Sequence, residues 1–490
     1  MGDPSKDSAR HLSHRKPNPL LARLPLAIAI VGSLVIALLL FVAPHGHGPE
    51  HTPTGLPSDW WIGTVPFAAL LAAIAAFPLI PALAHWWHSN LNRYVVSVVV
   101  SLAALAYLGA SGGAHAVGTA LHHAIPGEYI PFISLLFALY VIAGGIRIET
   151  PFDGKPWENT TILLVGGLIA SFVGTTGAAM ILIRPLLESL RRRRYRAPSV
   201  IFFIFIVCNC GGALLPIGDP PLFMGYLRGV PFFWTMSLWK EWALVNGLLL
   251  TAYFAIDTHL LRKERREVQA ADDHHRWRLE GAVNIPLLVG AIAAVALLVP
   301  GKTVVGTSFV APNFLREFVL LALAGLGYAL TAPHVRKRNR FDFVAIIEVA
   351  AIFIGIFISM QMPLEVLKAK GGDLGIESEI AFYWVTGALS SFLDNAPTYV
   401  VFFEIAKTLP IPEGVEALAL SDGVVSGDLL TAISLGAVFM GANTYIGNGP
   451  NFMVKAIAES DGVQMPSFFG YMAWSAGILV PLLALAEVFF

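Results

Sequence analysis

The segment Gly212-Ala-Leu-Leu-Pro-Ile-Gly-Asp-Pro-Pro-Leu-Phe-Met224 returns later in the chain as Gly441-Ala-Asn-Thr-Tyr-Ile-Gly-Asn-Gly-Pro-Asn-Phe-Met453. Seven of the thirteen positions are identical when the two copies are aligned without a gap. Glycine and proline both interrupt helices. Each copy therefore predicts a helix that breaks at its Ile-Gly-Asp or Ile-Gly-Asn step, and the repetition predicts two related halves.

The composition around these segments indicates a membrane protein. Of the 490 residues, 56% are hydrophobic and only 13% are charged, about half the charged fraction of a soluble protein. Apolar stretches long enough to cross a bilayer recur along the whole chain, so the sequence predicts an all-α polytopic membrane protein with about 11 spanning helices. We place them near 25–43, 61–84, 93–111, 129–147, 199–226, 231–260, 283–300, 315–333, 341–361, 428–455 and 466–489.

Two further apolar stretches, 159–190 and 379–407, have small and polar residues at their centres. The first contains Gly174-Thr175-Thr176-Gly177, and the second contains Asp394-Asn395-Ala396-Pro397. A helix facing lipid does not break in the middle, because the freed backbone groups would lack partners. We predict two re-entrant hairpins with their tips at mid-membrane. They also align without a gap, with Gly167, Ser171 and Phe172 opposite Gly387, Ser391 and Phe392.

The distribution of basic residues predicts how these segments are oriented. Cytoplasmic loops of membrane proteins are rich in lysine and arginine. If the N-terminus is cytoplasmic and each hairpin returns to its own side, the basic stretches 191–196, 262–278 and 336–340 all lie inside. Hairpin one then opens to the cytoplasm and hairpin two to the outside, as in an inverted repeat.

These patterns divide the chain into five predicted regions. They are a cytoplasmic basic tail (1–24), N-terminal membrane helices (25–92), repeat one (93–261, with its hairpin at 159–190 and its broken helix at 199–226), a cytoplasmic linker (262–282), and repeat two (283–490, with its hairpin at 379–407 and its broken helix at 428–455). No nucleotide-binding loop or hydrolase motif is present, so we expect ion gradients to supply the energy and expect no enzymatic activity, cofactor or nucleic-acid partner.

The broken helices and hairpin tips supply the chemistry. Broken ends leave N–H groups that favour anions and carbonyl groups that favour cations. If the two tips and two breaks meet, they form two pseudo-symmetric ion or substrate sites. Hard cations such as sodium bind oxygen ligands. The candidate binding residues are Thr175, Thr176, Asp219, Asp394, Asn395, Thr398, Asn443, Thr444, Asn448 and Asn451, and the candidate Na⁺ ligands among them are Asp219, Asp394, Asn395 and Asn448.

Two of these candidates are carboxylates, which cost roughly 2.5–3.5 kcal/mol to insert at membrane depth and are usually functional there. Asp394 lies at a hairpin tip and Asp219 at a helix break. Each could instead cap the half-helix that follows it, and the two roles are compatible. A desolvated carboxylate without a cation takes up a proton. Sodium and protons would then compete for one site.

Other polar residues in or near apolar stretches have more than one possible role. Arg184 could extend to the interface, bind an anion or pair with an acid. Glu348 could relay protons or form a structural ion pair. A metal site at His45, His47 and His51 in the first outside loop has little support from the sequence.

The paired hairpins and three phrases resemble the ion transporter superfamily. The phrases are Ser391-Phe-Leu-Asp-Asn-Ala-Pro-Thr398, Pro216-Ile-Gly-Asp-Pro-Pro221 and Ile446-Gly-Asn-Gly-Pro-Asn451. That superfamily includes D-type bacterial sodium/proton antiporters, arsenite permeases and di- and tricarboxylate transporters, among them proteins described as citrate transporters. The resemblance covers most of the chain from about residue 90 onward. It implies a homodimer in the bacterial inner membrane, with a scaffold domain and a transport domain that moves like an elevator.

The hairpin tips depart from one branch of that superfamily. The dicarboxylate members carry Ser-Asn-Thr at both tips, whereas this chain has Gly174-Thr175-Thr176 and Asp394-Asn395-Ala396. The Asp-Asn pair looks more like the antiporter branch. The sequence therefore favours a sodium/proton antiporter, with a sodium- or proton-coupled citrate or dicarboxylate transporter as the alternative. A channel or receptor-like protein is a third possibility.

Overall fold

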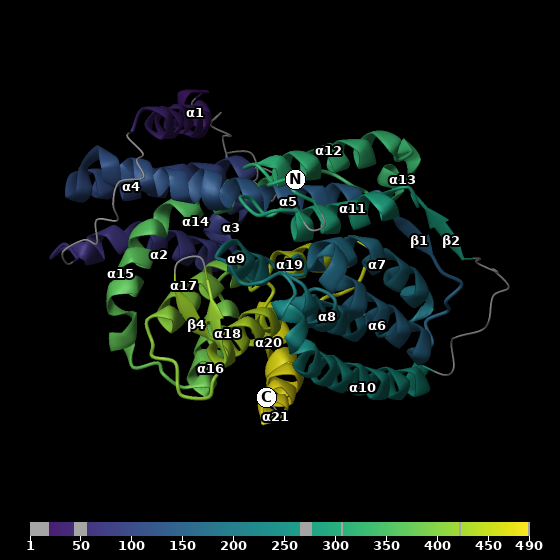
Figure 1. Ribbon diagram of the computed structural model, residues 1–490. Coiled ribbons are helices and arrows are strands. Elements are labelled where there is room, and N and C mark those ends of the chain that lie inside the picture. Colours follow the sequence, from purple (N-terminus) through teal and green to yellow (C-terminus); the bar gives the residue numbers. More distant parts are fainter. Residues whose placement is uncertain (1–18, 44–55, 265–276, 305–306, 421–422, 489–490) are drawn as a thin grey trace, which may run out of the picture.

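The computed structural model describes residues 19–43, 56–264, 277–304, 307–420 and 423–488. The described chain is almost entirely helical and forms two groups of helices, which lie mainly in the upper and lower parts of Figure 1. The first group contains α1 (Pro19–Val42), α2 (Trp60–Ala76), α3 (Pro81–Trp87), α4 (Asn90–His122), α5 (Ile130–Ala143), α11 (Asn284–Leu297), α12 (Leu315–Leu330), α13 (Pro333–Arg338), α14 (Val344–Ser359) and α15 (Gln361–Lys370).

The second group contains both predicted hairpins and both predicted broken helices. Its members are α6 (Pro156–Val173), α7 (Thr175–Ser189), α8 (Ala197–Ile206), α9 (Pro220–Leu227), α10 (Trp239–Glu264), α16 (Glu379–Ser390), α17 (Asn395–Lys407), α18 (Gly427–Met440), α19 (Gly449–Ser460), α20 (Phe468–Trp474) and α21 (Val480–Glu487). In Figure 1, α10 and α21 lie along the lower edge of this group, away from α1 and α4.

Burial separates the helices that face lipid from those at the centre. On α1, which packs along α4, Phe41 is 83% exposed although the helix is strongly apolar. On α8, every residue from Ser199 to Ile206 is buried. Exposed apolar faces of this kind are stable only against lipid or another protein, whereas a helix that is apolar all round belongs in the centre of a bundle.

The number of membrane crossings depends on how broken helices are counted. Six described segments are long and apolar enough to span a bilayer, and a seventh is added if α14 and α15, bent by 45°, form one span. The apolar helix α11 is shorter, as is the segment Gly427–Asn443. The chain is an all-α polytopic membrane protein. The expected spans 93–111 and 129–147 fall largely within one helical segment, Asn90–Ala143, and the expected span 283–300 corresponds to α11, which has only 14 residues.

The predicted hairpins coincide with two pairs of packed helices. α6 and α7 are separated by the single residue Gly174, and their far ends meet where the Ser189 hydroxyl donates to the Asn159 side-chain oxygen at 2.9 Å. α16 and α17 are separated by the segment 391–394 and pack together through Phe382 and Phe402. That these pairs enter the membrane and return to one side stays a prediction.

Short strands connect the ends of these elements. β1 (Arg147–Glu149), which precedes hairpin one, pairs antiparallel with β2 (Arg278–Glu280) at the end of the predicted linker. β3 (Ala417–Ala419) pairs with β4 (Val424–Ser426) between α17 and α18. The predicted linker begins inside α10, which continues to Glu264.

Candidate functional site

The two broken helices have nearly the same backbone at their breaks. Asp219, before α9, has φ −143° and ψ 145°, and Asn448, before α19, has φ −148° and ψ 141°. Each break also contains a short 3₁₀ turn, Cys210–Leu214 in the first and Gly441–Asn443 in the second. The repeat seen in the sequence is thus a repeat of local conformation, and it places Asp219 and Asn448 at equivalent positions.

Each hairpin is fastened to the break of its own half by an equivalent serine. The Ser171 hydroxyl donates to the carbonyl of Gly211 at 2.6 Å and accepts from the Leu214 backbone N–H at 3.0 Å. The Ser391 hydroxyl lies within 3.1 Å of the carbonyl of Met440 and accepts from the Asn443 side-chain amide at 3.0 Å. These contacts follow the two sequence alignments, so each tip and break pack as one unit.

The carboxylate of Asp219 joins the two halves. Its Oδ1 atom accepts from the Thr175 hydroxyl at 2.9 Å and from the Asn448 side-chain amide at 3.0 Å. Its Oδ2 atom accepts from the Asn395 side-chain amide at 2.7 Å. All four residues are buried. One carboxylate therefore contacts both hairpin tips and the opposite break, and we call these four residues the polar centre.

The polar centre also collects four helix N-termini. α7 begins at Thr175 and α17 at Asn395, while Asp219 and Asn448 immediately precede α9 and α19. Helix N-termini carry partial positive charge and favour an anion. In this structure the Asp219 carboxylate takes that place. It has only neutral hydrogen-bond partners in the described chain, with no lysine or arginine among them.

Sequence reasoning missed one residue at the edge of the polar centre. Asn209 is buried in the apolar run around the two cysteines, and its amide donates to the Asn451 side-chain oxygen at 2.8 Å. Its own oxygen accepts from Asn448 at 3.2 Å. Asn451 in turn donates to the carbonyl of Thr444 at 3.0 Å. An amide inside a run of valine, isoleucine and phenylalanine was the available signal, because such a group needs a partner there.

Two buried amide oxygens near the centre lack a hydrogen-bond donor within the described chain. They are the Oδ1 atoms of Asn395 and Asn443. Buried polar atoms are rarely left without a partner, and each exception calls for an explanation. Asn395 contacts the Asp219 carboxylate and Asn443 contacts Ser391, and amide and carboxylate oxygens are the donors that a hard cation uses. Asn443, Thr444 and Asn451 lie in or next to the second break, and their part in binding stays a prediction.

The remaining tip residues have more local contacts. The Asp394 carboxylate caps α17 by accepting from the Ala396 backbone N–H at 3.1 Å, and the Thr398 hydroxyl donates to the Asp394 carbonyl at 3.0 Å. Thr176 follows Thr175 and is half-buried. Capping of α17 by Asp394 is therefore present in the structure, and a direct part of Asp394, Thr176 or Thr398 in binding stays a prediction.

Arg184 and Glu348 lie outside the polar centre. Arg184 is nine residues beyond Thr175 on α7, about 14 Å along the helix, and donates to the Asn339 carbonyl at 2.8 Å. Glu348 forms an ion pair with Arg93 at 2.8 Å, between α14 and α4. The structural ion pair considered for Glu348 is thus observed. His45, His47 and His51 lie outside the described residues.

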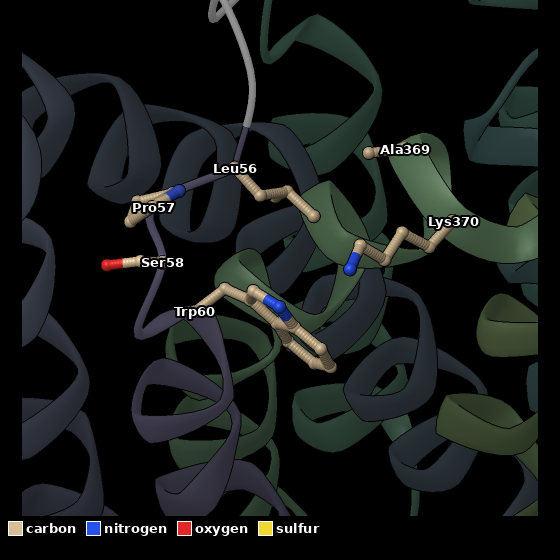
Figure 2. Close-up of a pocket in the computed structure, with 6 residues that line it drawn as sticks. All are labelled: Leu56, Pro57, Ser58, Trp60, Ala369 and Lys370. Atoms are coloured by element: carbon tan, nitrogen blue, oxygen red, sulfur yellow. The ribbon is translucent and has the colours of Figure 1, made fainter.

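A surface cavity of about 450 Å³ lies between the loop before α2 and the end of α15. Figure 2 shows its lining, where the Lys370 ammonium lies 4.9 Å from the centre of the Trp60 ring. None of its six lining residues belongs to the polar centre, so this cavity does not provide the ion site.

The chain is similar to known families and proteins. Residues 56–490 match the model of a family described as "Putative citrate transport". The chain belongs to this family. It is also similar to proteins named "uncharacterized transporter" from Mycobacterium tuberculosis and Mycobacterium bovis. Each is 24% identical over 389 residues, which cover 73% of this chain and 84% of the relative. The protein is thus a membrane transporter of the citrate transport family.

Proposed function

We propose that this protein is a secondary active transporter that exchanges Na⁺ for H⁺ at the polar centre. The observation that carries the proposal is the Asp219 carboxylate, which is buried and hydrogen-bonded to three neutral side chains from the other three interrupted elements. An isolated buried charge is costly, so the site gains free energy by binding either a cation or a proton. Binding of the two is then mutually exclusive.

The neutral groups around Asp219 suit Na⁺ more than a larger or softer ion. The Thr175 hydroxyl and the free Oδ1 atom of Asn395 are hard oxygen donors. A carboxylate with one bound Na⁺ and a protonated carboxyl group carry the same net charge. Asp219 is therefore neutralised in both cases, which lowers the cost of moving it through the membrane.

Asp394 supplies a second acidic group at the hairpin two tip, immediately before Asn395. Its Oδ1 atom is engaged in capping α17. We propose that the remaining carboxylate oxygen adds negative charge to the cation site without being the group that exchanges the proton. This assigns Asp219 the larger role, although both acids are candidate Na⁺ ligands.

Sodium-driven proton movement in proteoliposomes tests the proposal. Purified protein is reconstituted with a trapped pH indicator, and Na⁺ is added outside under a clamped membrane potential. In wild-type protein, Na⁺ entry in exchange for H⁺ should alkalinise the lumen, and K⁺ at the same concentration should not. Asp219→Asn should reduce the rate to that of empty liposomes. A normal rate in that variant would contradict the assignment.

Coupled transport of citrate or another carboxylate is the second candidate, favoured by two observations. The family is described by citrate transport, and four helix N-termini converge on one point, where an anionic substrate would be stabilised. Uptake of radiolabelled citrate or succinate, with Na⁺ or H⁺ gradients imposed separately, distinguishes the two functions. Accumulation above empty liposomes would establish carboxylate transport.

The membrane location, orientation and oligomeric state of the transporter are part of the proposal. We propose a bacterial inner-membrane location with a cytoplasmic N-terminus, because the basic stretches 191–196 and 336–340 then face inward. We also propose a homodimer in which α6–α9 and α16–α19 move relative to the first group of helices, α1–α5 and α11–α15. Crosslinking of purified protein in the bilayer would measure the oligomeric state.

A further inference from the structure

A second, smaller cavity is lined by five arginines from segments far apart in the sequence. Its volume is about 170 Å³, and the arginines are Arg147, Arg184, Arg191, Arg338 and Arg340. They come from β1, from α7 and the turn after it, and from the end of α13 with the loop that follows. Like charges gathered in one hollow repel each other unless something negative lies among them.

Two of the five arginines form ion pairs with acidic side chains. Arg147 pairs with Glu188 at 3.0 Å and with Glu149 at 3.1 Å. Arg338 pairs at 3.3 Å with Glu149 and with Glu280. These contacts are ordinary structural ion pairs around the β1–β2 ribbon.

The other acidic group in the lining forms its ion pair with an arginine outside the cavity. Asp461 directs its carboxylate to Arg196 at 2.6 Å, and Arg196 does not line the cavity. Within the described chain, no carboxylate pairs with Arg184, Arg191 or Arg340. Arg184 donates to a backbone carbonyl, and Arg340 contacts the Ser460 hydroxyl at 3.3 Å. Glu188 and Asp461 act on Arg184 electrostatically, but none of these three guanidinium groups forms a direct ion pair with a carboxylate of the described chain.

The geometry of these three groups favours a phosphate over a carboxylate. A carboxylate has two oxygens in one plane and is satisfied by one bidentate arginine, whereas a phosphate offers oxygens in tetrahedral directions. Arg184, Arg191 and Arg340 approach from an α7 face, the turn after α7 and a separate loop. The cavity is also smaller than the roughly 300–1,000 Å³ of pockets that hold drug-sized ligands, so it suits a small group.

The cavity lies at the far ends of two helices that begin at the polar centre. α7 starts at Thr175 and carries Arg184, and α19 starts after Asn448 and ends at Ser460, which Arg340 contacts. An anion held here would connect both helices to the loop after α13. Occupancy would therefore restrain the elements that hold Thr175 and Asn448 without touching the ion itself.

We propose that this arginine cavity binds a phosphate group, either free phosphate or the headgroup of an anionic phospholipid. The site is separate from the polar centre and does not depend on whether the transported species is Na⁺ or a carboxylate. It lies on the side that the basic loops predict to be cytoplasmic, where both sources of phosphate are available.

Calorimetric titration of the purified transporter with potassium phosphate tests the site. Potassium chloride at equal ionic strength is the blank, and Na⁺ is omitted so that the ion site plays no part. Wild-type protein should bind phosphate, and Arg184→Gln and Arg340→Gln should each weaken binding about tenfold or more. Arg192→Gln is the matched control, because Arg192 is an exposed neighbour that does not line the cavity, and it should bind as wild type does.

A further variant guards against loss of folding. Arg191 is exposed, and its side chain forms no hydrogen bond or ion pair within the described chain, so Arg191→Gln should leave the thermal midpoint unchanged while weakening phosphate binding severalfold. Equal binding by Arg191→Gln, Arg340→Gln and Arg192→Gln would overturn the proposal.

An experiment in lipid nanodiscs distinguishes free phosphate from a phospholipid headgroup. The thermal midpoint is measured in nanodiscs of phosphatidylcholine with and without phosphatidylglycerol. A stabilisation by phosphatidylglycerol that is lost in Arg191→Gln and Arg340→Gln but kept in Arg192→Gln identifies a headgroup. Binding of free phosphate in detergent with no such lipid effect identifies a soluble phosphate. Absence of both responses in the wild-type protein would refute the site.

Discussion

The first and second breaks share a backbone but differ in charge. Asp219 and Asn448 have almost the same backbone angles, and each precedes a short helix that points away from the polar centre. One carries a carboxylate, and the other carries the amide of the same shape. The two breaks thus have the same backbone, and the replacement of a carboxylate oxygen by an amide nitrogen at this position makes one side the anionic partner and the other its hydrogen-bond donor.

At the hairpin tips, the acidic residue belongs to the second half of the chain and not to the first. Hairpin one turns at the single residue Gly174, and hairpin two uses the longer segment 391–394 with an acid at the end. Thr175 and Asn395 nevertheless reach the same carboxylate. The comparison teaches that the tips need not match in length, provided that each delivers a neutral donor to Asp219.

Removal of the one charge at the breaks should have the largest effect. Asp219→Asn makes both breaks neutral while keeping a side chain that the equivalent position already accommodates. We expect sodium/proton exchange to fall by about 100-fold or more, because the exchanging group is gone. Proteoliposome fluorescence measures the rate, and size-exclusion chromatography should show an unchanged folded protein.

Exchange of the two side chains tests whether the frame is truly symmetric. The double variant Asp219→Asn, Asn448→Asp moves the carboxylate to the other half. We expect recovery to about a tenth of the wild-type rate. The recovery is incomplete because Asn448 donates to the Cys208 carbonyl at 3.1 Å, a contact that a carboxylate cannot make. A rate no higher than that of Asp219→Asn alone would show that the halves are not interchangeable.

Neutralisation of the acid at hairpin two should have a smaller effect. Asp394→Asn keeps an N-cap of similar quality, so we expect unfolding stability to stay within about 0.5 kcal/mol of wild type and exchange to fall by about fivefold to twentyfold. Asp394→Ala should additionally lose about 1 kcal/mol of stability with the cap. Thermal unfolding and transport assays separate the two contributions. Unchanged exchange in Asp394→Asn would reduce Asp394 to a capping residue.

The one-residue turn of hairpin one can be tested by adding a side chain at Gly174. Gly174 has φ 79°, a conformation that other residues rarely adopt, and a Cβ there would lie 3.4 Å from the Ile217 carbonyl oxygen. Gly174→Ala should cost about 1–3 kcal/mol of stability. Ser391→Ala in hairpin two is the comparison, because it leaves the backbone unstrained and removes only hydroxyl contacts. Equal thermal midpoints for Gly174→Ala and wild type would contradict the strain.

The smallest effect on transport is expected far from both breaks. Glu348 is paired with Arg93, whose side chain is only 5% exposed, so Glu348→Gln leaves a buried guanidinium without its counter-charge and should cost about 1–3 kcal/mol of stability. It should change exchange by less than about twofold, because the residue does not contact the polar centre. A transport loss comparable to that of Asp219→Asn would restore Glu348 as a proton relay.

The sequence contained much of this arrangement because its signals were local. The gapless repeat of Ile-Gly-Asp as Ile-Gly-Asn marked both breaks, and Gly174 and Asp394 marked both tips, since helix interruptions require particular residues at particular places. The meeting of Thr175, Asn395 and Asn448 at one carboxylate was expected in outline only. Which atoms touch depends on packing between segments that are distant in the sequence, and no local preference encodes it.

Other features needed the three-dimensional structure. Asn209 gave a weak signal, a lone amide among apolar residues, and its partner Asn451 lies in the other half. The arginine cavity combines residues from several separate segments, and their basic runs were interpreted from the sequence only as cytoplasmic loops. In both cases the grouping arises because elements of the two repeats pack against each other.

Proton release on sodium binding tests the central claim most directly. Purified wild-type protein in weakly buffered detergent solution, at a pH where the carboxyl group is protonated, is mixed with NaCl while a pH indicator is followed, and KCl serves as the blank. The account predicts release of about one proton per protomer on saturation with Na⁺, and none from Asp219→Asn. Sodium binding without proton release in the wild-type protein, or equal release from the variant, would contradict it.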